Sequence, residues 1–131
     1  MTSPSIQQIL DYEIQQVETS RDQRLGKGAP RPAAQKSLVG LAFSGGGIRS
    51  ATFNLGVLQA LAKSKLLRTL DYVSTVSGGG YIGGWLMGWM YHQSIGIREI
   101  EDRLSTPPKM PEEAGDPPEV HFLRDYSNYL T

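Results

Sequence analysis

Two consecutive stretches decide the fold: LVGLAFSGGGIRSATFNLGVLQALAK at residues 38–63 and LDYVSTVSGGGYIGGWLMGWMYH at residues 70–92. Each begins with a short apolar run, passes through three glycines and continues with apolar residues at helical spacing. A strand, a helix and a second strand in this order form a βαβ unit, whose strands are parallel and whose crossover is right-handed. The sequence therefore predicts an α/β fold, with three layers around a parallel sheet.

The first glycine loop follows the predicted strand at 38–43 and opens a helix. Open α/β sheets place ligands at this end of their strands, where the next helix presents free N–H groups. Arg49 falls in the first helical turn. A cation there interacts unfavourably with the helix dipole, which costs about 0.3–1 kcal/mol of stability. An anion between the glycine amides and Arg49 would explain this placement, so the loop predicts an oxyanion or phosphate site. The alternative is that the glycines only form a turn and Arg49 faces solvent.

The second loop carries Ser77 among small residues at the end of the next predicted strand. A nucleophile elbow has the pattern G-x-S-x-G, because bulky neighbours would clash with its tight backbone. Ser77 and Gly79 match this pattern, while Thr75 replaces the first glycine. We therefore predict that Ser77 is a nucleophile and that the Gly78 N–H is an oxyanion donor. The alternative is that Ser77 is the N-cap of the following helix.

These motifs resemble those of the patatin-like and cytosolic phospholipase superfamily of lipid acyl hydrolases. The G-G-G-x-R motif of that family matches residues 45–49, and its serine elbow matches residues 77–79. The resemblance covers residues 38–92, and residues 123–131 are similar to bacterial relatives. It implies that Ser77 attacks a lipid ester carbonyl, forms an acyl-enzyme and releases a fatty acid on hydrolysis. The oxyanion hole that it implies consists of Gly45, Gly46, Gly47, Arg49 and Gly78.

The same resemblance implies a phospholipid or other lipid ester as substrate, with peripheral membrane contact and no metal or cofactor. The family's general base is an Asp followed by Gly, and no Asp in this chain precedes Gly. Asp71 is about 20 Å from Ser77 along the strand, and His92 about 22 Å along the helix. Four other residues remain possible by sequence but have no motif around them: Asp102, Asp116, His121 and Asp125. Of these, Asp125 is expected to pair locally or to face solvent. We therefore expect an incomplete domain, the N-terminal part of a longer hydrolase, that is inactive by itself.

The composition excludes several other classes of protein. Thirteen Lys and Arg balance 13 Asp and Glu, which argues against nucleic-acid binding. The absence of Cys excludes disulfides, Cys-based zinc sites and a cysteine nucleophile. The first eight residues lack the pattern of a signal peptide, so the expected location is cytoplasmic, with membrane association left open.

Two arms flank the glycine-rich centre. Residues 6–17 have the spacing of an amphipathic helix with Ser5 as N-cap. This helix is expected to pack on the domain or on a partner; the alternative is a membrane surface. Residues 19–37 are predicted to be a polar linker, and the proline-rich residues 105–119 a loop. The predicted division is thus 1–37, helix and linker, and 38–131, part of a patatin-like domain.

Three other interpretations remain open at this stage. A nucleotide-binding module is one, because Gly45, Gly47 and Ser50 nearly match a dinucleotide fingerprint. A non-catalytic lipid-binding fragment is the second. A membrane span at 78–97 is the third, but its strongly apolar part, 81–91, is short against the roughly 20 residues needed. That stretch therefore favours a buried core helix.

Overall fold

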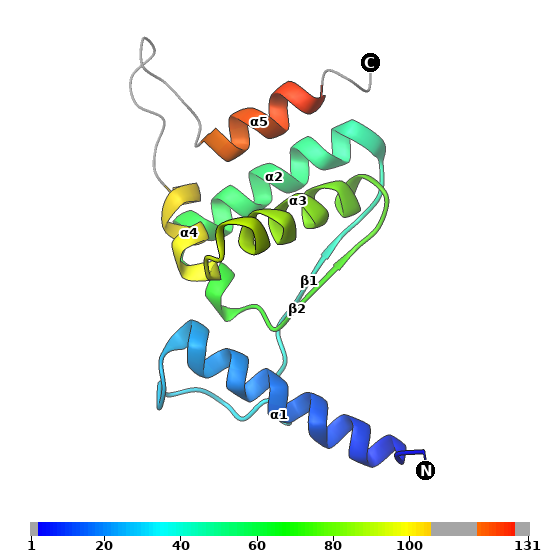
Figure 1. Ribbon diagram of the computed structural model, residues 1–131, viewed down its shortest axis with the longest axis vertical. Coiled ribbons are helices and arrows are strands. Elements are labelled where there is room, and N and C mark those ends of the chain that lie inside the picture. The colour runs from blue at the N-terminus through cyan, green and yellow to red at the C-terminus, as the bar shows by residue number, and fades with distance from the viewer. Residues whose placement is uncertain (1–2, 106–117, 128–131) are drawn as a thin grey trace.

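The computed structural model describes residues 3–105 and 118–127 (Figure 1). Its elements follow one another along the chain as α1 (Ile6–Leu25), β1 (Gly40–Phe43), α2 (Gly47–Lys63), the 3-10 helix η1 (Leu67–Thr69), β2 (Tyr72–Thr75), α3 (Gly78–Gln93), α4 (Ile97–Ser105) and α5 (Pro118–Ser127).

The two predicted strands pair in parallel as neighbours. Gly40 is opposite Tyr72, and Phe43 is opposite Thr75. Each strand is four residues long, shorter than its apolar run in the sequence. The pairing continues one step further, because the Val76 N–H donates to the Phe43 carbonyl at 3.1 Å. The structure thus confirms the α/β class and the parallel sheet, and it brings the two glycine loops to the same end of the strands (Figure 1).

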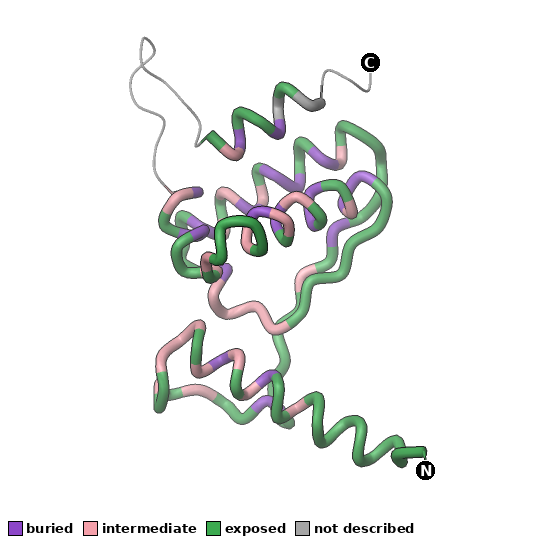
Figure 2. The backbone as a smooth tube through the Cα atoms, viewed as in Figure 1, coloured by how far each residue is buried: buried purple, intermediate pink, exposed green. Residues whose placement is uncertain are grey.

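The core lies where α2 packs against α3 and α4, and where α3 packs against both strands (Figure 2). Burying a Leu, Ile or Phe side chain stabilises the fold by roughly 1.5–3 kcal/mol, so this cluster is the main apolar contribution. As predicted for 81–91, α3 is a core helix with Ile82, Leu86 and Trp89 buried. None of the helices in the described residues is long and apolar enough to span a membrane. Within this cluster, the most buried side chains are Leu58, Ala62, Leu67, Ile82, Ile100 and Val120.

Glycines at the start of α3 let this helix lie directly on the strands. A Cβ at Gly79 would be 2.4 Å from the carbonyl oxygen of Phe43, and one at Gly83 would be 2.6 Å from Cγ2 of Thr75. Real Cβ atoms do not approach other atoms so closely, so a side chain here would push α3 off the sheet. This contact explains the glycines at positions 79 and 83, although each glycine costs about 1 kcal/mol in a helix.

The first helix is longer than its apolar spacing predicts. Ser5 is its N-cap, as expected, and forms a capping box with Gln8. The helix continues to Leu25, however, so the prediction of a linker beginning at residue 19 is wrong. The last two turns of α1 contain few apolar residues. Their Arg21 and Arg24 instead form ion pairs with Asp71, which is distant in the sequence.

A buried ionic cluster fastens α1 to the start of both strands. Arg21 donates to both oxygens of Asp71, at 2.8 and 2.6 Å, and Arg24 donates to Oδ1 of Asp71 at 2.9 Å. Asp71 also accepts the N–H of Val39 at 2.9 Å. The hydrogen bond from Arg21 is the main reason why the pKa of the Asp71 carboxyl is held well below its usual range. The cluster lies at the opposite end of the strands from the glycine loops (Figure 1).

The C-terminal arm is described only in part. Ser105 ends α4, and residues 118 and 119 open α5, so the ends of the predicted loop at 105–119 are helical. The rest of that prediction, 106–117, lies outside the described residues.

Candidate active site

The two strand-to-helix turns meet at Ser77 and Gly45. A Cβ built on Gly45 would lie 3.1 Å from the Cβ and 3.7 Å from the Oγ of Ser77. A Cβ on Gly78 would lie only 2.2 Å from the carbonyl oxygen of Gly47. The two loops are therefore in backbone contact, and only glycine permits it at Gly78. The structure thus brings together Ser77, Gly45, Gly47 and Gly78, all of them predicted site residues.

The backbone of Ser77 has the strained geometry of a sharp turn. Its φ is +51° and its ψ is −120°, a region that costs a non-glycine residue on the order of 1–3 kcal/mol. The side chain forms no capping hydrogen bond with α3. Ser77 therefore occupies the N-cap position of α3, as the alternative interpretation expects, but its hydroxyl does not cap the helix. Ser77 is also exposed, so its hydroxyl is accessible from solvent.

Thr75 takes the place of the first glycine of the elbow pattern without a clash. Its side chain points toward α3, where its Cγ2 would be 2.6 Å from a Cβ on Gly83 and its Oγ1 would be 3.9 Å from one on Gly80. In the usual pattern, a glycine before the serine leaves space for the neighbouring helix. Here the space for the Thr75 side chain is left by the absence of a side chain at Gly83. The departure from G-x-S-x-G is thus accommodated by α3.

The glycine loop presents free backbone donors. Gly46 and Gly47 have φ values of +142° and +61°, and α2 begins without a side-chain cap or an acidic residue in its first turn. Within residues 3–105 and 118–127, nothing accepts a hydrogen bond from the N–H of Gly45 or Gly46. The N-terminus of α3, also uncapped, lies beside this loop. Two helix N-termini and unpaired N–H groups together favour a negatively charged atom at this point.

Arg49 lies in the first turn of α2, as predicted, and its side chain is exposed. It forms no ion pair with any residue that the structure describes. A cation without an acceptor, one turn from free N–H groups, adds to the positive potential of the loop. No contact of the guanidinium with Ser77 is seen.

The described acidic and imidazole groups lie elsewhere. Asp71 is enclosed by Arg21 and Arg24, and Asp102 binds Lys65 at 2.5 Å. Asp125 pairs with His121 at 2.9 Å one turn away and is mostly exposed, which confirms the expectation of a local pair facing solvent. None of the described residues forms a hydrogen bond with the Ser77 side chain, and they contain no cluster of three or more potential metal ligands. Asp116 lies outside the described residues.

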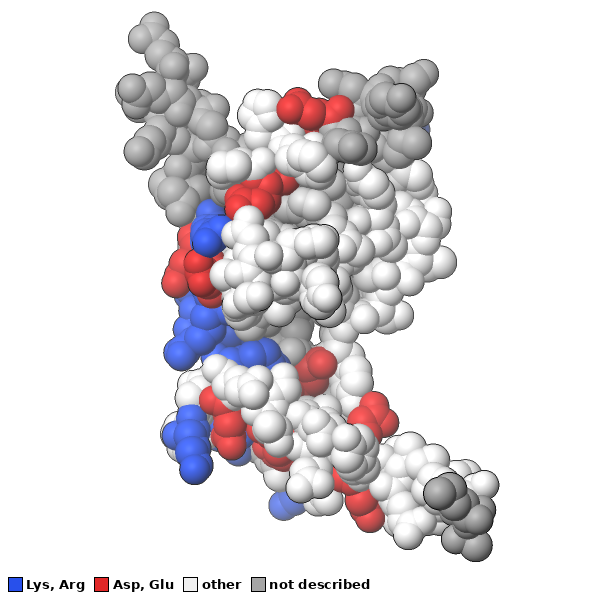
Figure 3. Space-filling view, viewed as in Figure 1, with Lys and Arg blue, Asp and Glu red and all other residues white. Residues whose placement is uncertain are grey.

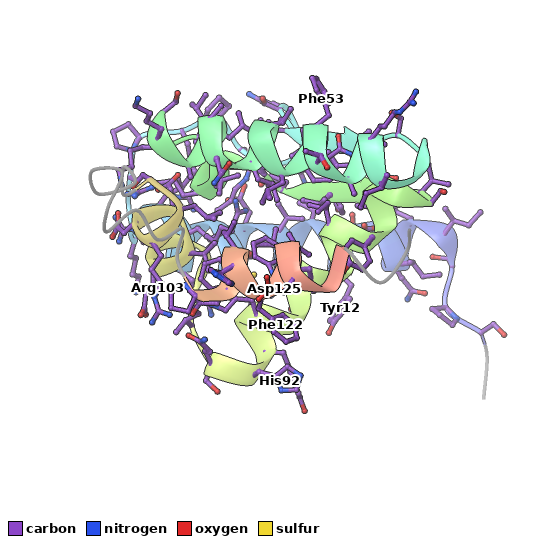
Figure 4. All side chains as sticks on the ribbon, turned by 90° about the horizontal axis from the view of Figure 1, so that it is seen from above. Tyr12, Phe53, His92, Arg103, Phe122 and Asp125 are labelled. Carbon is purple, nitrogen blue, oxygen red and sulfur yellow. The ribbon has the colours of Figure 1, made fainter. Side chains whose placement is uncertain are left out.

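A cavity of about 520 Å³ runs along α2 from the site, beneath α5. Ile48 and Tyr81 line its end nearest the loops, one residue after Gly47 and one turn after Ser77. Viewed from above, α5 lies between α2 and α3, with Asp125 on it, while Phe53 points away on the far side of α2 (Figure 4). The helix α5 was not predicted from the sequence, although its apolar Val120 and Leu123 are three residues apart and both are buried. The rest of the lining is Ala51, Thr52, Leu55, Gly56, Gln59, Ile82, Leu123 and Asp125.

Comparison with known proteins identifies the central region of the chain. Residues 41–104 match the family model described as patatin-like phospholipase. Neither the curated proteins nor the solved structures contain a match. The matched region includes both glycine loops, Ser77 and the helices that position them. Residues 41–104 are therefore similar to the patatin-like phospholipase family.

Proposed function

We propose that the protein is a lipid acyl hydrolase in which Ser77 is the nucleophile and the glycine loop is the oxyanion hole. One observation carries this proposal: the Ser77 hydroxyl, on a strained and uncapped turn, lies within a few ångströms of Gly45, whose N–H has no acceptor among the described residues. The match of residues 41–104 to the patatin-like phospholipase model supports a lipid ester as the substrate class.

In the proposed reaction, Ser77 Oγ forms a bond to the ester carbonyl carbon as its proton passes to a general base. The carbonyl oxygen becomes an anion held by the N–H groups of Gly45, Gly46, Gly47 and Gly78, with Arg49 adding charge. Collapse breaks the bond to the alcohol, which leaves with a proton, and water then hydrolyses the acyl-enzyme. Each oxyanion donor typically contributes a factor of about 10²–10³ to kcat. The base is not among the side chains that contact Ser77 in the described residues.

The surface and the cavity around the site fit an acyl chain. The cavity contains no Lys or Arg, and its lining near the site is apolar. In the view of Figure 3, charged side chains gather where α1 meets the rest of the molecule. Near the two turns, the exposed Arg49 is the cation in the first turn of α2. A cavity whose end near the site is lined by Ile48 and Tyr81 is suited to a lipid tail, and the surface beside it is suited to peripheral contact with a membrane.

A fluorophosphonate probe tests the nucleophile directly, because it reacts with activated serines. We expect the natural full-length protein to be labelled at Ser77 and the label to disappear in Ser77→Ala. Ser94→Ala is the matched control, since Ser94 has the same φ of +51° at the other end of α3. Labelling that persists in Ser77→Ala, or a wild type that is not labelled, would contradict the proposal.

A non-catalytic lipid-binding role is a second candidate, favoured by the absence of a described base beside Ser77. It predicts saturable binding of a fluorescent fatty acid without labelling and without ester turnover. Measurement of binding and labelling on the same preparation separates the two functions.

A further inference from the structure

Ser50 forms a hydrogen bond that a helical serine does not usually form. Helical Ser side chains typically donate to the carbonyl four residues back, which would be Gly46 here. Ser50 Oγ instead donates to the carbonyl oxygen of Ser44 at 2.6 Å, six residues back and outside α2. The hydroxyl thus connects the helix to the residue just before the glycine loop.

Asn54 fixes the direction of this hydrogen bond. Its Nδ2 donates to Ser50 Oγ at 3.1 Å. Because an amide nitrogen only donates, the Ser50 oxygen accepts there and its single proton is left for Ser44. Asn54 is 4% exposed on the buried face of α2, where an amide costs free energy unless it is hydrogen-bonded. The hydrogen bond to Ser50 satisfies this buried amide and orients the Ser50 hydroxyl.

The orientation of the Ser44 carbonyl determines that of the next N–H. In a trans peptide the C=O of one residue and the N–H of the next point in opposite directions in one plane, and no cis peptide occurs among the described residues. With the Ser44 carbonyl held by Ser50, the Gly45 N–H points away from Ser50. The loop itself lies between the two serines, since a Cβ on Gly46 would be 3.1 Å from Ser50 Cβ, and one on Gly45 would be 3.1 Å from Ser77 Cβ.

We propose that Ser50 and Asn54 are positioning residues that hold the Ser44–Gly45 peptide with its N–H available to the oxyanion. Consecutive glycines restrict backbone rotation very little, so the loop has few restraints of its own. Without the hydroxyl, this peptide can rotate and present a carbonyl oxygen where the donor is needed, which would repel the oxyanion. This inference rests on the proposed function of the glycine loop, and it assigns the loop's orientation to side chains of α2.

The test is ester hydrolysis by the full-length protein with Ser50→Ala, which keeps a strong helix former in α2. Loss of one oriented donor lowers kcat by roughly 10²–10³, so we expect at least a tenfold lower kcat with KM changed less than twofold. Ser50→Thr keeps the hydroxyl and should restore most of the activity. Ser50→Ala combined with Asn54→Leu should have the kcat of Ser50→Ala alone, because both act through one chain of hydrogen bonds.

A trifluoromethyl ketone adds a readout that a merely structural role would not change. The adduct of this ketone with a serine is an anion that the oxyanion donors stabilise. The Ki of the ketone should therefore rise in Ser50→Ala by about the factor by which kcat falls. Thr19→Ala is the control, since that hydroxyl also donates to a backbone carbonyl, Gln15 at 3.0 Å, but on α1. If Ser50→Ala does not fold, Ser50→Cys, which has a similar size and a much weaker donor, takes its place.

The outcomes separate this inference from the proposed function. If Ser77→Ala abolishes turnover while Ser50→Ala keeps the wild-type kcat, or loses kcat without recovery in Ser50→Thr, the inference is overturned alone. If turnover survives Ser77→Ala, the proposed function itself fails, and the inference fails with it.

Discussion

At the scale of single residues, the site depends on where a side chain is absent. Gly78 is in direct contact with the Gly47 carbonyl, and Gly45 with Ser77. A methyl group at Gly78 would push the two loops apart, whereas one at Gly45 would require Ser77 to shift slightly. The strained turn at Ser77 persists because these contacts hold it from both sides.

Gly78→Ala is expected to disrupt the site. Its Cβ would lie 2.2 Å from a backbone oxygen, which cannot move away as the end of a flexible side chain can. We expect labelling of Ser77 by the fluorophosphonate to slow by at least tenfold and the Tm to fall.

Gly84→Ala is the matched control for Gly78→Ala, because it changes another glycine of α3 with nothing within 4 Å of the added Cβ. This variant should keep wild-type labelling and gain about 0.5–1 kcal/mol of stability from its higher helix propensity. Equal effects of the two variants on labelling would contradict the role given to the contact between the loops.

At the scale of elements, each end of the strands is held by a different kind of interaction. At one end, backbone contacts between the two glycine loops join β1–α2 to β2–α3. At the other end, Arg21 and Arg24 of α1 enclose Asp71, whose side chain is fully buried. Removal of one partner from a buried ion pair leaves an uncompensated charge, which costs about 3–5 kcal/mol.

Asp71→Asn should therefore lower the free energy of unfolding by about 3–5 kcal/mol. Equilibrium denaturation at neutral pH measures this change. Asp102→Asn removes a carboxylate from a pair with Lys65 at the surface and should change stability little. If the two variants are equally stable, the cluster around Asp71 does not fasten α1.

The same cluster predicts a dependence of stability on pH. The pKa of Asp71 is lowered in the folded state, so its stabilisation is complete above the unfolded value of about 3.9. The stabilisation is lost as pH falls below that value toward the folded pKa. The difference in unfolding free energy between wild type and Asp71→Asn should thus be constant from pH 7 to about 5 and shrink below pH 4. A difference that grows on acidification would contradict this assignment.

At the scale of the whole molecule, stability and the site are carried by different parts. The largest apolar contribution lies among α2, α3 and α4, whereas the loops meet at the ends of α2 and α3. Ile100 on α4 is completely buried and belongs to the core.

Ile100→Ala should lower the free energy of unfolding by about 2–5 kcal/mol. The labelling rate per folded molecule should nevertheless match the wild type at a temperature well below the Tm. A matched loss of labelling at that temperature would show that the site depends on the α4 side of the core. Thermal unfolding and labelling on the same samples distinguish these outcomes.

Local patterns in the sequence determined the βαβ unit, the two glycine loops and the candidate nucleophile, because alternation, helical spacing and glycine clusters act over a few neighbouring residues. Only the tertiary structure decided that the polar end of α1 is helical, because Arg21 forms its ion pair with Asp71, a residue that lies 50 positions further along the chain. It also decided that Thr75 replaces a glycine without a clash and that Ser50 reaches Ser44 outside its own helix. Such contacts join elements that meet only after folding, so no local pattern of residue types encodes them.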